Sequence, residues 1–149
     1  MSEEIDTYTH PFYLFRSSEL CWKCHAPCQV VALASGGGEP FVLSDIRSLP
    51  EEILLSMTAA QPNYELRCSQ TTGSEYLMNT CPCGAHFGDY FLYSKPGGAF
   101  FPTAEDEAAQ IEVIELPLQG SFEIDCSPGM GLGGFILQYG KRLSWDSIE

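Results

Sequence analysis

The distribution of hydrophobic and polar positions along this chain predicts several short β-strands. Residues 11–15 (Pro-Phe-Tyr-Leu-Phe) and 29–34 (Gln-Val-Val-Ala-Leu-Ala) are apolar runs rich in aromatic and β-branched residues, which favour strands. The two runs flank a segment that contains cysteines, so we expect them to pair as a hairpin with that segment near its tip. Residues 35–38 (Ser-Gly-Gly-Gly) should end the second strand.

Further strands are indicated by alternation of apolar and polar residues or by short apolar runs. They are expected over residues 64–69, 75–80, 111–116, 122–126 and 135–139, and residues 89–93 are expected to form a strand or a short helix. The first two of these should pair with each other across a turn at residues 71–74.

Two helices are predicted from their start signals. Ser48 is expected to cap a helix that has Pro50 near its first turn and ends before Pro62. Thr103 is expected to cap a short helix that begins with acidic residues. Together these elements predict one α+β domain over residues 1–149, mostly antiparallel β-sheet with one or two short helices.

Composition and charge limit the types of partner that such a domain is expected to bind. The 149 residues include 7 basic and 20 acidic ones, which gives a formal net charge of −13 at pH 7. Nucleic-acid binding normally needs a lysine and arginine footprint, so this charge disfavours nucleic acid and favours a basic protein partner. No apolar run approaches the roughly 20 residues of a membrane helix. The acidic start at residues 1–6 lacks the regions of a signal peptide, so we expect a cytoplasmic protein with no membrane partner.

Two close cysteine pairs are the strongest chemical signal. Cys21 and Cys24 form a Cys-x-x-Cys motif, and Cys81 and Cys83 form a Cys-Pro-Cys motif after a domain-sized insertion. Zn²⁺ prefers four tetrahedral sulfur ligands, and each pair can present two sulfurs to one ion. The single residue in the second motif still permits chelation, because side chains two apart on an extended backbone point to the same side. We predict that these four cysteines form a structural zinc site of the ribbon type.

The remaining cysteines leave alternatives open. Cys28 or His25, both close to the first pair, could replace a ligand, and the grouping of Cys28 with that pair also admits an iron–sulfur cluster. Zinc is favoured because the second pair completes four sulfurs without Cys28. A thioredoxin-like redox role is disfavoured because no βαβ pattern surrounds the first pair. Cys28, Cys68 and Cys126 are then expected to fill the core as small hydrophobic residues.

The sequence does not indicate an enzyme. A site with four cysteine ligands leaves no coordination position for water, which a catalytic zinc requires. No His-Glu-x-x-His motif occurs, and the His-x-Glu element of zinc deaminases is missing. The glycine-rich segment 129–134 lacks the Lys-Ser or Lys-Thr of a phosphate-binding loop, so a tight turn is the better interpretation. A thiol-dependent enzyme that uses Cys28 or Cys68 is an alternative.

The cysteine pairs belong to a longer pattern that resembles a group of uncharacterised bacterial proteins. That pattern has an early Cys-x-x-Cys, a Val-Val-Ala-Leu-like strand, and a later Cys-Pro-x-Cys-Gly-Ala followed by Gly-Asp-Phe-Phe-Leu. Its counterparts here are residues 21–24, 30–33, 81–85 and 88–92. The chain departs from the pattern by lacking one residue in the second cysteine pair. The resemblance implies a zinc-ribbon-type fold and a zinc site, and it implies no particular activity.

These expectations combine into a functional hypothesis. A small acidic domain held together by zinc is suited to bind another protein, and its charge would speed the encounter with a basic partner. The most specific version is an immunity protein or antitoxin that inhibits a basic toxin or nuclease. A nucleic-acid-associated zinc ribbon is the second class, although Lys141 and Arg142 form the only adjacent basic pair in the sequence.

Overall fold

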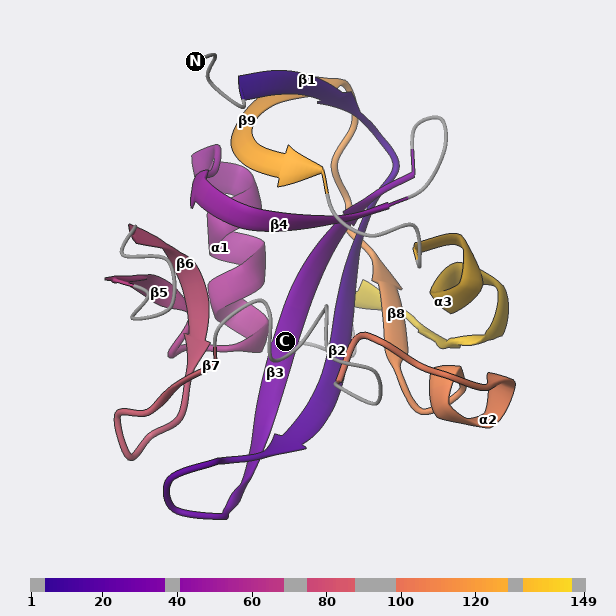
Figure 1. The fold of residues 1–149 in the computed structure, drawn as a ribbon. Coiled ribbons are helices and arrows are strands. Elements are labelled where there is room, and N and C mark those ends of the chain that lie inside the picture. Colours follow the sequence, from indigo (N-terminus) through magenta and orange to yellow (C-terminus); the bar gives the residue numbers. More distant parts are fainter. Residues whose placement is uncertain (1–4, 37–40, 69–74, 88–98, 129–132, 146–149) are drawn as a thin grey trace.

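The computed structural model describes residues 5–36, 41–68, 75–87, 99–128 and 133–145. These residues form a seven-stranded sheet with strand order β1-β9-β4-β3-β2-β8-β10 and a three-stranded sheet with order β5-β6-β7 (Figure 1). Neighbouring strands are antiparallel, apart from the parallel pair β8 and β10. The predicted class, α+β with mostly antiparallel sheet and short helices, is therefore confirmed.

The strands of the small sheet, β5 to β7, form one block of the chain between β4 and β8 of the large sheet. The strands are β1 (Ile5–Thr9), β2 (Phe12–Leu20), β3 (Pro27–Ser35), β4 (Phe41–Ser48), β5 (Glu65–Cys68), β6 (Glu75–Thr80), β7 (His86–Phe87), β8 (Glu112–Glu115), β9 (Ser121–Pro128) and β10 (Lys141–Leu143). The helices are α1 (Glu51–Ala60), α2 (Glu105–Ala108) and α3 (Gly133–Tyr139). No helix in these described ranges is long and apolar enough to cross a membrane.

The long strands β2 and β3 form the hairpin that the sequence predicted. They pair from Phe12 opposite Ser35 to Leu20 opposite Pro27, so the first cysteine pair lies in the loop at the hairpin tip. Strand β3 lies between β2 and β4 in the interior of the sheet. Both faces of β3 are covered, which explains why its sequence is a continuous apolar run and not an alternating one.

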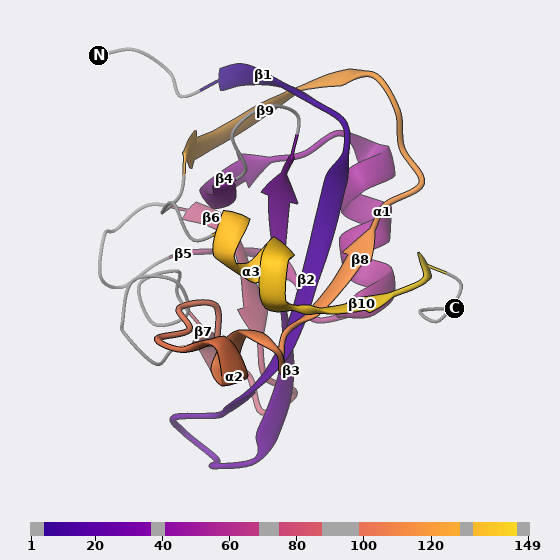
Figure 2. The ribbon, with the colours of Figure 1, turned by 90° about the vertical axis from the view of Figure 1, so that its right-hand side faces the viewer.

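Two hydrophobic clusters lie on opposite faces of the large sheet. On one face Ile53 of α1 packs against residues from β2, β3 and β8. On the other face Ile136 of α3 packs into a second cluster, which also contains Cys21 and Cys81. Figure 2 shows α1 and α3 on opposite sides of the strands. The cysteine pairs are thus attached to one of the two cores.

A side-chain amide occupies part of the β3 edge that β4 leaves unpaired. Strand β4 pairs with β3 only from Leu33 to Ser35. Farther along, Asn79 of β6 accepts a hydrogen bond from the backbone N–H of Val31 at 2.8 Å and donates one to the Val31 carbonyl at 3.0 Å. Both residues are buried, so these bonds satisfy backbone groups that water cannot reach. Asn79 therefore takes the place of a neighbouring strand and fixes β6 beside β3.

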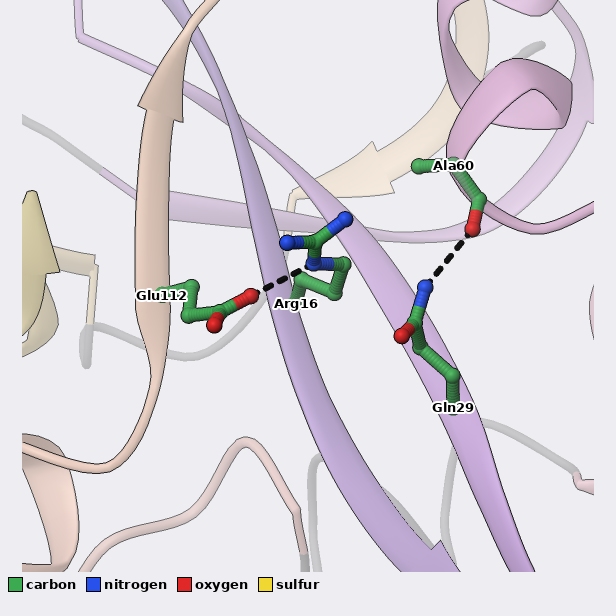
Figure 3. A network of polar contacts seen from close by, with 4 residues as sticks. All are labelled: Arg16, Gln29, Ala60 and Glu112. Atoms are coloured by element: carbon green, nitrogen blue, oxygen red, sulfur yellow. Dashed lines mark hydrogen bonds and ion pairs between the residues drawn. The ribbon is translucent and has the colours of Figure 1, made fainter. Parts of the chain in front are cut away.

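Other polar contacts tie the hairpin to the elements around it. The Gln29 amide donates a hydrogen bond to the Ala60 carbonyl at 2.8 Å (Figure 3), and the Gln61 amide donates one to the Gln29 carbonyl. Figure 3 also shows Arg16 of β2 paired with Glu112 of β8. The end of α1 and strand β8 are held to the hairpin by these bonds.

The prediction of a strand at residues 135–139 is wrong, because this segment belongs to helix α3. Phe135 and Tyr139 lie one helical turn apart and contact edge to face, with ring centroids 5.1 Å apart. A run of apolar residues in a short segment does not distinguish a strand from a buried helix, so the tertiary contacts decide.

The predicted helix caps are also wrong. Pro50 and Ala104 occupy the N-cap positions of α1 and α2, and neither makes a side-chain capping bond. Ser48 is the last residue of β4. The backbone N–H and hydroxyl of Thr103 instead donate to the Glu107 carboxylate, and these bonds lower the pKa of Glu107.

The expectations for residues 71–74, 89–93 and 129–132 lie outside the described residues.

We predict that Asn79→Ala lowers the free energy of unfolding by about 2–4 kcal/mol, because two buried backbone groups of Val31 lose their partner. Urea unfolding followed by circular dichroism would measure the loss. The control is Gln29→Ala, which removes the hydrogen bond of an exposed side chain to Ala60 and should cost about 0.5–1.5 kcal/mol. Equal losses in the two variants would show that the Asn79 contact is not what holds β6.

Candidate metal centre

The hairpin tip and the connection between β6 and β7 bring the two cysteine pairs together. The Sγ atoms of Cys21, Cys24, Cys81 and Cys83 all lie within 4.8 Å of one another. Two Sγ–Sγ distances join a cysteine of the first pair to a cysteine of the second: Cys21 to Cys83 and Cys24 to Cys81, each 3.7 Å. These distances are much longer than the roughly 2.05 Å of a disulfide bond. Four free sulfurs in this arrangement could hold a metal ion.

The hairpin loop is folded so that its two sulfurs face the same point. The backbone N–H of Cys21 donates to the Ala26 carbonyl, and the N–H of His25 donates to the Cys21 carbonyl, both at 2.9 Å. The N–H groups of Lys23 and Cys24 donate to the Cys21 sulfur at 3.3 and 3.4 Å. His25 has a φ of 65°, a left-handed conformation that turns the chain back toward β3.

The second loop repeats this scheme with one residue fewer. The N–H of Cys81 donates to the Ala85 carbonyl, and the N–H of Gly84 donates to the Cys81 carbonyl, both at 2.8 Å. Gly84 directly follows the second cysteine of its pair, as His25 does, and it has a φ of 99° that glycine adopts without strain. The shorter Cys-Pro-Cys motif therefore keeps the hydrogen-bonding pattern of the longer one.

Trp22 links the two loops directly. Its indole N–H donates a hydrogen bond to the backbone carbonyl of His86, at the start of β7, at 2.8 Å. Trp22 was not predicted as a site residue, although its position between two predicted ligands was a signal. His86 contributes to the surroundings of the site through this backbone carbonyl.

Each cross-loop sulfur pair combines one buried and one exposed cysteine. Cys21 and Cys81 are buried, whereas Cys24 and Cys83 are exposed. The buried members belong to the cluster beneath α3, and the exposed members face solvent. The site is therefore anchored in the core on one side and accessible on the other.

Two of the thiols resist ionisation because of their neighbours. The pKa of Cys81 is raised to about 12, first by its interaction with the Cys28 side chain. A hydrogen bond from the backbone of Ala26 lowers the pKa of Cys24, but partial desolvation and the Cys81 and Cys21 sulfurs outweigh it and raise the value to about 11. In the metal-free protein both thiols are protonated at neutral pH.

Cys21 behaves in the opposite way. Burial raises its pKa, but hydrogen bonds from the backbone N–H groups of Cys24 and Lys23 outweigh burial and lower the pKa to about 6. The Cys21 sulfur is thus ready to bind a cation, while the Cys24 and Cys81 thiols must first lose protons. Metal binding at these thiols releases protons, and it weakens as the pH falls.

The alternative ligands considered from sequence lie outside the four-sulfur group. Among the residues that the structure describes, the group contains neither His25 nor Cys28. Cys28 and Cys126 are buried, one in each hydrophobic cluster, so both fill core space as predicted. The side chain of Cys68 lies outside the described part of the chain.

We predict that Cys24→Ser and Cys83→Ser each lose bound metal and much of the folding stability. Both side chains are exposed, so the loss cannot come from a cavity in the core. Metal content by inductively coupled plasma mass spectrometry and thermal unfolding by circular dichroism would measure the two effects.

The control is Cys28→Ser, which changes a buried thiol outside the group and should retain one metal ion per chain. Full metal content in both Cys24→Ser and Cys83→Ser would show that the four-cysteine assignment is wrong. Metal loss in the control alone would assign the site to a different set of sulfurs.

Comparisons with known proteins do not assign a family. No protein-family model matches the chain, and no curated protein or solved structure matches it. The resemblance to the bacterial group with two cysteine pairs therefore stays a prediction.

Proposed function

We propose that this chain is a zinc-stabilised domain that binds another protein. The observation that carries the proposal is a group of four sulfurs where the tip of a long hairpin meets the loop after β6, beside two exposed apolar side chains, Leu20 and Trp22. Four thiolate ligands fill a tetrahedral coordination shell and leave no position for water or substrate. The role of such a site is to hold the hairpin tip in place.

The sulfur separations support zinc as the ion. A tetrahedral site with Zn–S bonds of about 2.3 Å places its sulfurs about 3.8 Å apart. The two cross-loop separations of 3.7 Å are close to this value. An iron–sulfur cluster would place several iron and sulfide ions among the thiolates and would need a wider cage. The spacing therefore favours one ion, and zinc is a common ion in tetrahedral four-sulfur sites.

Zinc would connect two loops that are far apart in the sequence. One loop follows β2, and the other follows β6, which the Asn79 contact holds beside β3. Structural zinc contributes on the order of 10 kcal/mol in small domains. The ion would therefore add a strong link between the hairpin tip and the loop after β6 and make their shared surface more rigid.

The hairpin tip presents apolar side chains to solvent. Leu20 is 62% exposed and Trp22 is 56% exposed, and the two residues flank Cys21. Large apolar side chains held in place on a surface are typical of contact sites for other proteins, and tryptophan is enriched among the residues that dominate binding energy. We assign this pair as the centre of the partner-binding surface.

The charge of the chain favours a basic partner. With 20 acidic against 7 basic residues, the long-range field of the protein attracts a positively charged surface and speeds its encounter. An immunity protein or antitoxin that inhibits a basic toxin or nuclease would use both the charge and the apolar tip. This is the specific function that we propose.

The two alternative functions, nucleic-acid binding and thiol-dependent catalysis, have less support. Arg142 lies over the Tyr13 ring at 5.5 Å and donates to the Leu137 carbonyl at 3.2 Å, so internal contacts engage its guanidinium group. This weakens the basic pair on which a nucleic-acid role would depend. For a thiol-dependent enzyme, Cys28 is only 5% exposed, which limits the access of a substrate.

We predict that Leu20→Ser weakens binding of the partner and that Leu55→Ser does not. Leu20 and Leu55 are 62% and 60% exposed, so the pair compares the same change at the hairpin tip and on helix α1. Burying a leucine in an interface is worth about 1.5–3 kcal/mol, which corresponds to roughly a tenfold to hundredfold loss of affinity. The measurement is capture from native-cell lysate, followed by titration of the purified partner.

Support for the proposal requires a basic protein bound one to one, with weaker binding in Leu20→Ser and at higher salt. Equal binding by both leucine variants would contradict the assigned surface. An empty capture with folded, zinc-loaded protein would contradict the partner-binding function itself.

A further inference from the structure

Two sulfur pairs at the metal centre, each 3.7 Å apart, are built in the same way. Each joins the loop after β2 to the loop after β6, and each pairs a buried with an exposed cysteine: Cys21 with Cys83, and Cys24 with Cys81. A sulfur that solvent can reach therefore lies 3.7 Å from a sheltered sulfur on the other loop. This arrangement suits a reaction in which an oxidant attacks the exposed member and the buried member completes a bond.

We propose that the same four cysteines are a redox site, in which a peroxide replaces the metal ion by two disulfides, Cys21–Cys83 and Cys24–Cys81. The two bridges join the loops that the metal ion joined, so the hairpin tip stays attached to β6 and β7 after the ion has left. The inference builds on the proposed metal site, and it does not depend on the partner.

The reaction needs one peroxide for each bridge. The exposed thiolate of Cys24 or Cys83 attacks the peroxide, the O–O bond breaks, and a sulfenic acid and hydroxide form. The buried thiolate of Cys81 or Cys21 then attacks that sulfur, the S–S bond forms, and the S–O bond breaks with release of a second hydroxide. Each bridge removes two electrons from a sulfur pair and reduces one peroxide. The metal ion is released because a disulfide no longer offers thiolate ligands.

The structure also argues for cross-loop bridges over bridges within a loop. In the hairpin loop, the N–H groups of Lys23 and Cys24 both donate to the Cys21 sulfur, which keeps this sulfur tied to the turn of its own loop. Cys83 of the other loop lies 3.7 Å from the Cys21 sulfur. Closure across the loops therefore requires movement of the sulfurs by less than 2 Å, since a disulfide measures about 2.05 Å.

The experiment starts from the zinc-loaded full-length protein treated with hydrogen peroxide. Zinc release is followed with a chromophoric chelator, free thiols are blocked with N-ethylmaleimide, and the protein is digested with trypsin without reduction. Cleavage after Lys23 separates Cys21 from Cys24. Cys24 and Cys28 share one tryptic peptide, as do Cys81 and Cys83, so fragmentation of the linked peptides in the mass spectrometer assigns the bridged sulfurs within each peptide. We expect release of one zinc ion per chain together with both cross-loop bridges.

Single variants simplify the assignment. The variants Cys83→Ser and Cys24→Ser are both expected to lose the metal, so they are oxidised in the metal-free form. Cys83→Ser should form only the Cys24–Cys81 bridge and leave Cys21 blocked by maleimide, and Cys24→Ser should form only Cys21–Cys83. Cys28→Ser is the matched control, because it removes a nearby buried thiol and should leave both bridges unchanged. The oxidised metal-free protein should also melt at a higher temperature than the reduced metal-free protein.

Three results would overturn the proposal: a Cys21–Cys24 bridge, a bridge to Cys28, or sulfinic and sulfonic acids without any bridge. A melting temperature equal to that of the reduced metal-free protein would show that the bridges do not hold the tip. If the chain bound no zinc at all, the proposed function would fail, while the same peptide analysis on the metal-free protein would still test the cross-loop pairing.

Discussion

The candidate metal centre depends on the position of β6 beside the unpaired edge of β3. Asn79 exchanges two hydrogen bonds with the backbone of Val31 there, and Cys81 follows Asn79 by only two residues. The same hairpin that offers Val31 also carries Cys21 in the loop at its tip. The sulfurs of the two loops therefore meet because a buried amide completes a strand edge, and the metal ion would reinforce a geometry that the scaffold already sets.

The residues of the candidate metal centre could be predicted from the sequence better than the arrangement of the helices and the contacts between distant segments. The cysteine pairs and the hairpin were predictable because both are local patterns: short sulfur spacings, and apolar runs on either side of them. Helix α3 was not predictable, since the contact between Phe135 and Tyr139 exists only once the segment is helical. The bonds from Asn79 to Val31 and from Trp22 to His86 join residues distant in the chain, so no local pattern predicts which partner each side chain has.

Two of the arginines form ion pairs with acidic residues on neighbouring strands. Arg16 pairs with Glu112, and Arg47 of β4 pairs with Asp125 of β9 at 2.9 Å. These ion pairs link neighbouring strands of the sheet, so part of the small basic complement neutralises acidic groups inside the fold. The chain keeps a formal net charge of −13, which supports the proposed attraction of a basic partner.

The central claim is that four cysteine sulfurs of this chain bind one zinc ion. X-ray absorption at the zinc edge of the purified protein tests it most directly, because the fine structure reports the number, type and distance of the ligands. We predict four sulfur neighbours at about 2.3 Å and no nitrogen or oxygen neighbour. A shell with nitrogen or oxygen ligands, or a purified protein without zinc, would contradict the account.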